Sequence, residues 1–309
     1  MGSNMNRERL HVGYFADGPW AHMAFQKLIA DESIQIDFIC VRFDNRDPVL
    51  CEFAHMHQIQ LFCVSNVNSM DFMEKLRGIQ SDLFVSMSFN QIFKQEIINL
   101  PRLKTINCHA GKLPFYRGRN ILNWVLINDE KEFGITVHYV DEGIDTGDII
   151  LQDTYPITDD DDYGTLLEKA YSGCADILYR SIKLIQNGTV TRIKQSTIDP
   201  IGLYCGLRTA GDEIIDWNQS SRHIFNFIRA LTRPGIGATS YMDGKEVKIY
   251  KAELVDGAHK YINTPGQILM KTDDNFIVKT KDTIIKITDY EYKGKVKVGA
   301  RFSSGRGDH

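Results

Sequence analysis

Short apolar runs alternate with stretches of helical periodicity through the first 110 residues. The apolar runs predict strands at 10–16, 36–43, 61–66, 82–88 and 105–110. The stretches between them predict helices at 19–31, 47–58, 70–79 and 93–100. Parallel strands need helix-length crossovers, so this alternation predicts an α/β fold with a doubly wound, mostly parallel sheet.

The middle of the chain predicts one more helix at 118–130 and then two antiparallel strands at 135–140 and 147–157. A long helix is expected at 162–188, where apolar residues recur at helical spacing up to a stop at Asn187-Gly188. The acidic run at 159–162 is interpreted as capping of this helix rather than a calcium loop.

The pattern changes near residue 200. A helix at 220–232 is followed by short strand-like runs at 246–255, 266–272, 275–280 and 283–292, separated by Gly, Asp and Asn. We therefore expect two domains, a catalytic domain over 1–200 and a smaller β-rich domain over 201–309.

The composition narrows the classes of function. The chain has 309 residues, of which 43% are hydrophobic and 25% charged, as in ordinary globular proteins. No apolar run approaches the ~20 residues of a membrane span, and no signal peptide is evident, so the cytoplasm is the expected compartment. Six cysteines form no C-x-x-C pair, which disfavours zinc and redox motifs. The net charge of −4 disfavours binding of nucleic acid mainly through phosphates.

Three residues are candidates for catalysis. Asn107 and His109 lie two apart near the end of a predicted strand, so their side chains share a face. Asp145 lies in a loop bounded by Gly143 and Gly147. An amide can stabilise an oxyanion, an imidazole can accept a proton and a carboxylate can orient the imidazole, which together suit acyl transfer without a metal. Taken singly, each residue is more often structural.

The runs NCHAGKLPFYRG at 107–118 and DEGIDTGDI at 141–149 resemble the signature of the folate-dependent formyltransferases. This family includes methionyl-tRNA formyltransferase, glycinamide ribonucleotide formyltransferase and the nucleotide-sugar N-formyltransferases. The resemblance covers roughly residues 10–190 and implies the formyltransferase-like Rossmann-type fold and an N10-formyl-tetrahydrofolate donor. It gives Asn107 the role of oxyanion donor, His109 that of general base and Asp145 that of its partner. It also implies a folate pocket formed by Met87, Ser88, Phe89, Asp141, Gly143 and Ile144.

The identity of the acceptor amine depends on the first loop of the chain and on the charge of the carboxyl-terminal part. The loop at 16–20 lacks the G-x-G-x-x-G pattern of dinucleotide binding, but its D-x-P-W-A sequence is similar to that of sugar N-formyltransferases. From Tyr241 onward there are 13 Lys and Arg against 10 Asp and Glu, whereas a tRNA-binding domain would be clearly basic. We therefore expect a dTDP- or UDP-linked amino-deoxy sugar, used for a surface glycan such as lipopolysaccharide. The substrate-binding residues expected are Gly18, Pro19, Trp20, Lys112, Tyr116 and Arg117.

Two other functions stay open: methionyl-tRNA formyltransferase, and a catalytically silent binding protein on the same scaffold. The expected partner is the small nucleotide-sugar substrate, with no nucleic acid and no membrane, and a homodimer is left open. Tyr204, Trp217 and Tyr241 are candidates for stacking on the nucleotide base, with core packing as the alternative.

Overall fold

The structure is a computed structural model that describes residues 9–303. The chain forms two compact units. The N-terminal unit contains residues up to 118 together with 133–155 and 168–204. The C-terminal unit contains 119–132, 156–167 and the residues from 205 onward.

A seven-stranded sheet with the order β3-β2-β1-β4-β5-β7-β8 is the centre of the N-terminal unit. The first five strands in this order pair in parallel, and β7 pairs antiparallel to β5. The strands are β1 Leu10–Ala16, β2 Ile34–Val41, β3 Gln60–Cys63, β4 Leu83–Met87, β5 Thr105–His109, β7 Glu132–Tyr139 and β8 Ile149–Pro156. The predicted doubly wound, mostly parallel sheet is confirmed.

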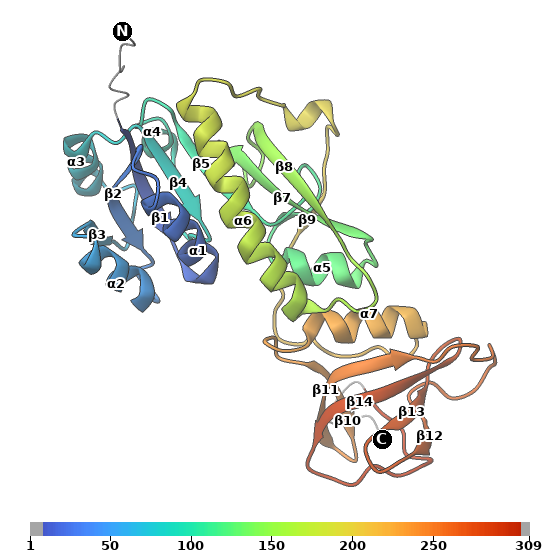
Figure 1. Cartoon of the computed structure of the whole chain (residues 1–309). Helices are drawn as coiled ribbons and strands as arrows, with labels where there is room; N and C mark the ends of the chain where they lie inside the picture. Colours follow the sequence, from blue (N-terminus) through green and yellow to red (C-terminus); the bar gives the residue numbers. More distant parts are fainter. Residues whose placement is uncertain (1–8, 304–309) are drawn as a thin grey trace. The chain divides into compact units, whose positions relative to one another are not determined.

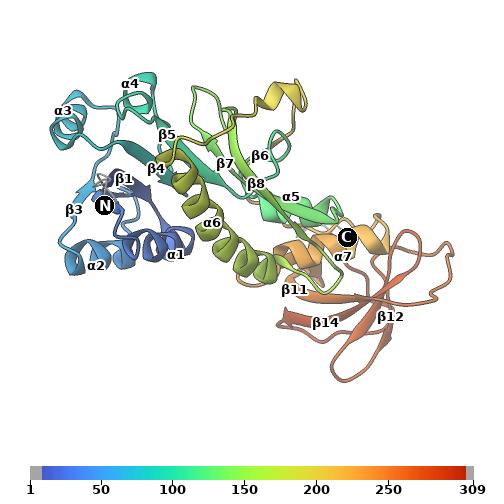
Figure 2. The same cartoon turned by 45° about the horizontal axis from the view of Figure 1, so that its top comes forward.

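Helices cover both faces of this sheet. Figure 2 shows α1 (Gly18–Ile29) and α2 (Pro48–Met56) on one face, with α3 (Met70–Ile79) and α4 (Gln95–Ile98) on the other. The core under α3 and α4 is rich in phenylalanine. The ring of Phe15 on β1 lies 5.0–6.4 Å from the rings of five others, namely Phe38, Phe72, Phe84, Phe89 and Phe93.

Hydrogen bonds join the long helix α6 (Tyr163–Gln186; Figure 1) to the turn before β2. The Asp31 carboxylate accepts hydrogen bonds from the Ser33 hydroxyl, the Tyr179 hydroxyl and the Lys183 ammonium at 2.6, 2.9 and 2.9 Å. Burial alone would raise the pKa of Asp31, but these hydrogen bonds outweigh it and hold that pKa well below its usual range.

The helix expected at 118–130 is shorter, since α5 spans Ile121–Ile127. Residues Arg117–Gly118 instead form the short strand β6, and the Arg117 amide donates to the Leu203 carbonyl. Asn120 then adopts a left-handed conformation with φ +55°, which turns the chain into the helix. The other short elements are the 3₁₀ helix η1 (Gln195–Thr197) and the strand β9 (Tyr204–Cys205).

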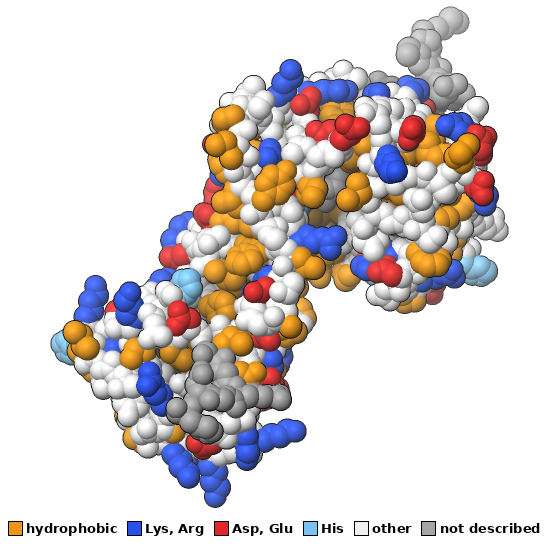
Figure 3. Space-filling model, turned by 180° about the vertical axis from the view of Figure 1, so that it is seen from behind, with side chains coloured by type: hydrophobic (Ala, Val, Ile, Leu, Met, Phe, Trp, Pro, Cys, Tyr) orange, Lys and Arg blue, Asp and Glu red, His pale blue; other side chains and the backbone are white. Residues whose placement is uncertain are grey.

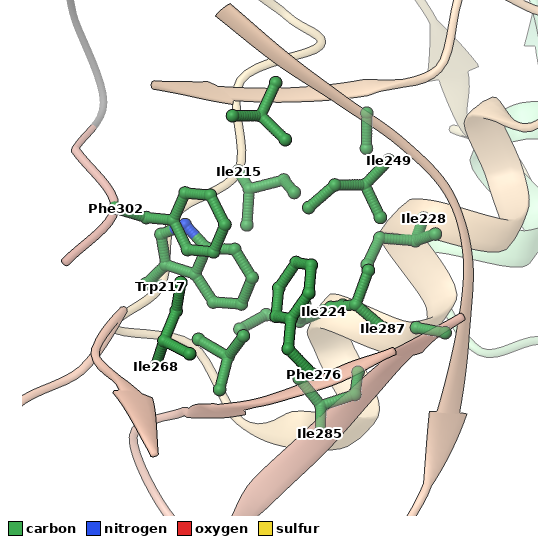
Figure 4. Close-up of a cluster of buried hydrophobic side chains, with 14 of the residues drawn as sticks. Ile215, Trp217, Ile224, Ile228, Ile249, Ile268, Phe276, Ile285, Ile287 and Phe302 are labelled. Carbon is green, nitrogen blue, oxygen red and sulfur yellow. The ribbon is translucent and has the colours of Figure 1, made fainter. Parts of the chain in front are cut away.

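The C-terminal unit contains a five-stranded antiparallel sheet with the order β10-β11-β14-β13-β12 and the helix α7 (Ser221–Leu231). The strands are β10 Ala238–Met242, β11 Lys245–Leu254, β12 Ile268–Lys271, β13 Phe276–Lys279 and β14 Ile284–Tyr292. Inward side chains of this sheet, of α7 and of adjoining segments form the apolar cluster of Figure 4, in which the rings of Trp217 and Phe302 stack with their centroids 5.0 Å apart. The smaller β-rich part expected at the carboxyl end is confirmed.

Candidate active site

Strand pairing brings four polar side chains to one end of the central sheet. Asn107 and His109 lie two residues apart on β5. In the antiparallel pair with β7, Asn107 lies opposite His138 and His109 lies opposite Thr136. Side chains two apart on a strand share a face, so these residues form one polar cluster at the carboxyl end of β5.

A backbone carbonyl orients the His109 imidazole. Nε2 lies 2.7 Å from the Tyr116 carbonyl oxygen, and because that oxygen can only accept, Nε2 carries the hydrogen. Tyr116 reaches this position in a left-handed conformation with φ +58°. Gly111 makes the approach possible, because a Cβ at this residue would lie 2.4 Å from Nε2 and 2.5 Å from the Tyr116 oxygen. The lone pair of neutral His109 is therefore on Nδ1.

The Asp145 carboxylate lies between two imidazoles. Oδ2 is 3.6 Å from His109 Nδ1, and Oδ1 is 3.4 Å from His138 Nε2. The Gly118 amide also donates to Oδ2 at 3.0 Å. Burial would raise the pKa of Asp145, but the charge of His109, the hydrogen bond and charge of His138 and the Gly118 amide together hold it well below its usual range. The carboxylate therefore stays ionised.

His138 is a member of the cluster that the sequence analysis did not single out. Its Nδ1 donates to the Tyr139 carbonyl at 2.8 Å, and its side chain is almost completely buried. In its neutral form Nε2 accepts from the Asn107 amide at 3.3 Å, and in its protonated form Nε2 can donate to Asp145. The sequence shows His138 only as a single histidine in an otherwise apolar strand, β7. Its place in the site follows from the register between β7 and β5, which the sequence does not show.

The Asn107 side chain keeps a donor for a ligand. Its Nδ2 carries two hydrogens, of which the contact with His138 uses one. Asn107 is half-buried, while His109 and His138 are buried. The arrangement can thus supply an amide donor, a basic nitrogen and an ionised carboxylate to one reacting group.

The residues expected to bind folate lie on two neighbouring segments. Phe89, just after β4, and Val140, just after β7, pack against the same apolar cluster. Ser88 is exposed and left-handed with φ +58°, whereas Met87 is buried and its carbonyl accepts from the Asp17 amide. In the second segment the Asp141 carboxylate accepts from the Gly143 amide and from Thr146, and Ile144 is 57% exposed.

The residues expected to bind the acceptor differ in exposure and in the contacts that they make. The Gly18 amide at the start of α1 donates to the Asp47 carboxylate at 2.8 Å, so this amide is already bonded within the protein. Pro19 is exposed, and the Trp20 ring packs edge-on against Tyr171, 4.7 Å between centroids.

The predicted residues on the loop after β5 have structural contacts of their own. Lys112 is half-buried, and Tyr116 is buried with its carbonyl on His109. Arg117 is buried, and its guanidinium donates to the Gln195 side-chain oxygen. Recognition of an anionic ligand by Arg117 would compete with these bonds.

The three aromatic candidates for base stacking differ in exposure. Trp217 is buried in the core of the C-terminal unit, where its Nε1 donates to the Ser240 hydroxyl at 3.0 Å. Tyr241 is half-buried on β10, and Tyr204 is 54% exposed. Core packing therefore accounts for Trp217.

Residues 9–303 contain neither a candidate metal site nor a candidate membrane span. No three or more His, Cys, Asp or Glu side chains of this range are grouped so that they could hold a metal ion. None of the helices described is both long enough and apolar enough to cross a membrane.

Comparisons with protein-family models and with known proteins agree on one family. Residues 43–181 match the formyl transferase domain and residues 208–306 match the formyl transferase C-terminal domain. The methionyl-tRNA formyltransferase of Caldanaerobacter subterraneus subsp. tengcongensis is 36% identical over 234 residues, which cover 76% of this chain and 74% of that protein.

Solved structures share the fold. A sugar 3N-formyl transferase, WlaRD, crystallised with dTDP and 5-N-formyl-THF, has a TM-score of 0.69 at 22% identity, covering 93% of this chain and 99% of that chain. An N-formyltransferase from Helicobacter canadensis, in complex with folinic acid and dTDP-3-aminofucose, has a TM-score of 0.67 at 22% identity, covering 92% and 100%. The folate donor expected from the sequence agrees with the folates in these two structures. With both family domains matched along most of its length, the chain belongs to the formyl transferase family and is a formyltransferase.

Proposed function

We propose that the protein transfers the formyl group of N10-formyl-tetrahydrofolate to the amine of a dTDP- or UDP-linked amino-deoxy sugar. The observation that carries the catalytic part is the convergence of Asn107, His109 and Asp145 around one small volume at the end of β5. The Asp145 oxygens lie within 3.6 Å of both imidazoles of the cluster, which is close enough for direct electrostatic coupling.

His109 is the general base in this proposal. Because Nε2 is committed to the Tyr116 carbonyl, Nδ1 is the nitrogen that takes the proton of the attacking amine. The resulting imidazolium lies beside the ionised Asp145 carboxylate, whose charge stabilises it. Asp145 therefore keeps the transferred proton within the site, from which it can return to the leaving group.

Asn107 is the oxyanion donor. The second hydrogen of its Nδ2 can meet the negative charge that develops on the formyl oxygen. Loss of one such donor typically costs about 10²–10³ in turnover. While His138 is neutral, its contact with the Asn107 amide limits rotation of that amide, so the donor is oriented before substrate arrives.

The donor supplies a formyl carbon that is open to attack by an amine. The residues that would hold its flat ring system are Ser88 and Phe89 on one segment and Ile144 on the other. Ile144 fits this role because a largely exposed apolar side chain directly precedes the catalytic carboxylate. The hydrogen bonds of Asp141 to Gly143 and Thr146 keep that segment in shape.

The acceptor class is supported by charge. The last 69 residues carry 13 basic and 10 acidic side chains, which is close to balance for a domain that would have to hold tRNA phosphates. The two sugar N-formyltransferase structures also align with almost the whole of this chain. A surface-glycan precursor in the cytoplasm is the corresponding biological substrate.

The test is a direct acceptor screen. Purified protein is incubated with N10-formyl-tetrahydrofolate and dTDP- or UDP-linked 3-amino and 4-amino sugars or methionyl-tRNA, and tetrahydrofolate release and the formylated product are measured. We expect product with at least one nucleotide sugar and none with methionyl-tRNA. Formylation of methionyl-tRNA alone would overturn the acceptor, and no transfer to any amine would overturn the donor chemistry.

Methionyl-tRNA formyltransferase is the second candidate, and the 36% identical relative of that name favours it. Lys293, Lys295 and Lys297 are all exposed, and Figure 3 shows Lys and Arg side chains (blue) along the rim of the C-terminal unit. Binding of tRNA through phosphates would weaken steeply between 50 and 200 mM salt, by about 10³-fold or more for six contacts. Salt-sensitive tRNA binding is therefore the discriminating observation.

A further inference from the structure

A segment distant in sequence holds the loop that carries Asp145. Gln195, in η1, is 3% exposed, and both polar atoms of its amide face into the N-terminal unit. Its Nε2 donates to the carbonyls of Asp145 and Gly147, each at 2.8 Å. Both of its amide hydrogens are therefore bonded to the backbone of the catalytic loop.

The other side of the amide is fixed by Arg117. The Gln195 Oε1 accepts from Arg117 Nε at 3.1 Å and from Nη2 at 2.8 Å, and Arg117 Nη1 donates to the Ile201 carbonyl at 3.2 Å. A guanidinium can only donate, so it dictates which end of the amide is oxygen and which is nitrogen. Arg117 thereby determines that Gln195 presents donors to the loop.

The loop needs such support. Asp145 adopts φ +55°, a conformation that costs energy for a residue with a side chain. A second bond from the same segment joins the Tyr204 hydroxyl to the Ile144 carbonyl at 3.2 Å. The carbonyls of three residues in the loop, Ile144, Asp145 and Gly147, are thus held from the segment that follows α6.

From these contacts we propose that Gln195, oriented by Arg117, is a positioning residue that holds the Asp145 carboxylate against His109. The proposal rests on the catalytic roles assigned above. Without the two bonds from Nε2, the loop relaxes and the carboxylate moves away from Nδ1. A displaced carboxylate no longer stabilises the protonated imidazole, so both turnover and its dependence on pH change.

Gln195→Glu is the informative variant. A glutamate keeps an oxygen for Arg117 but replaces the donor with a second oxygen facing two carbonyls. The contacts with the catalytic loop are therefore lost, and the added negative charge pairs with Arg117. Gln186→Glu is the matched control, because Gln186 also accepts from a cation, Lys183 at 2.7 Å, and donates to a carbonyl, that of Ser33 at 3.0 Å. Gln186 lies on α6, outside the candidate site.

With the full chain and the acceptor found in the screen, we expect Gln195→Glu to lower kcat about 10- to 100-fold. The acid limb of its pH–rate profile should move to lower pH, while Gln186→Glu stays within about twofold of wild type. A folded Gln195→Glu variant with wild-type kcat and pH profile would overturn the proposal. If that variant does not fold, Gln195→Met, which also lacks the donors but adds no charge, is held to the same criteria.

A readout independent of turnover separates this proposal from the proposed function. The His109 ring proton is followed by NMR through a pH titration of wild type, Gln195→Glu and Gln186→Glu, with His109→Asn used to assign the signal. A titration midpoint that falls in Gln195→Glu alone supports the positioning role even if no acceptor has been found. Equal midpoints in all three proteins would refute it even in an active enzyme.

Discussion

Gly111 offers a sharp test of how His109 is oriented. In Gly111→Ala, the new Cβ would lie 2.4 Å from His109 Nε2 and 2.5 Å from the Tyr116 carbonyl oxygen. These distances are about 1 Å short of the 3.4 Å at which ordinary contact begins. Moving the imidazole relieves only the first of these clashes, so the imidazole and the backbone at Tyr116 must both shift. The 2.7 Å hydrogen bond between them is then broken or bent.

The expected cost follows from that displacement. Misplacing a catalytic group by about 1 Å lowers turnover by about 10²-fold, and overpacking a tight site costs about 1–3 kcal/mol of stability. We therefore expect kcat to fall about a hundredfold while the protein still folds. Gly78→Ala is the matched control, because Gly78 lies on α3 with open space around its Cβ position. It should leave kcat unchanged and raise stability by about 0.5–1 kcal/mol.

The assay measures initial rates of tetrahydrofolate release at saturating donor, together with thermal unfolding of both variants. A folded Gly111→Ala protein with kcat within about threefold of wild type would refute the reasoning, since it would mean that the bond between His109 and Tyr116 does not orient the base.

The remaining predictions concern the site and the pH dependence of stability. His109→Asn and Asp145→Asn should each lower turnover by about a hundredfold or more, and wild-type rates in either variant would contradict the roles proposed. Asn107→Ala should lower kcat by about 10²–10³ with little change in the KM for the donor, and a change confined to KM would exclude the oxyanion role. Asp31→Asn should cost about 1 kcal/mol at pH 7, because Asp31 is hydrogen-bonded but partly screened by solvent. Its folded-state pKa lies below the unfolded value, so the stabilisation is complete above about pH 5 and fades as the pH falls below 4; denaturant titrations that show a constant difference down to pH 2 would contradict this.

Much of the fold was accessible from the sequence because its elements are strongly patterned. The strand over 10–16 and the helix over 70–79 have the predicted bounds, and most other elements differ by a few residues at their ends. β10 (Ala238–Met242) was not predicted, since its inward positions include the small residues Ala238 and Ser240. Ser240 accepts a hydrogen bond from the Trp217 indole, a contact that no local pattern encodes.

The sequence predicted only part of the candidate site. The motifs singled out Asn107, His109 and Asp145, and the structure brings these three together. His138 and Gln195 could not be inferred in the same way. His138 reaches Asn107 through an antiparallel register, and Gln195 reaches Asp145 from 50 positions further along the chain. Such contacts depend on tertiary structure, whereas the motifs are local.

The C-terminal unit is assembled from three stretches of chain rather than one. These stretches are 119–132, 156–167 and the residues from 205 onward. Asn123 in the first stretch donates a hydrogen bond to the Ala230 carbonyl on α7. Arg229, also on α7, donates to the carbonyls of Thr158 and Asp161 in the second stretch. A recombination event with one breakpoint, such as one near residue 200, would exchange α7 and its sheet while leaving both earlier stretches behind. The side chains of a foreign carboxyl-terminal segment would then not fit those of α5. Exchange of this unit between enzymes therefore requires compensating changes at 119–132 and 156–167.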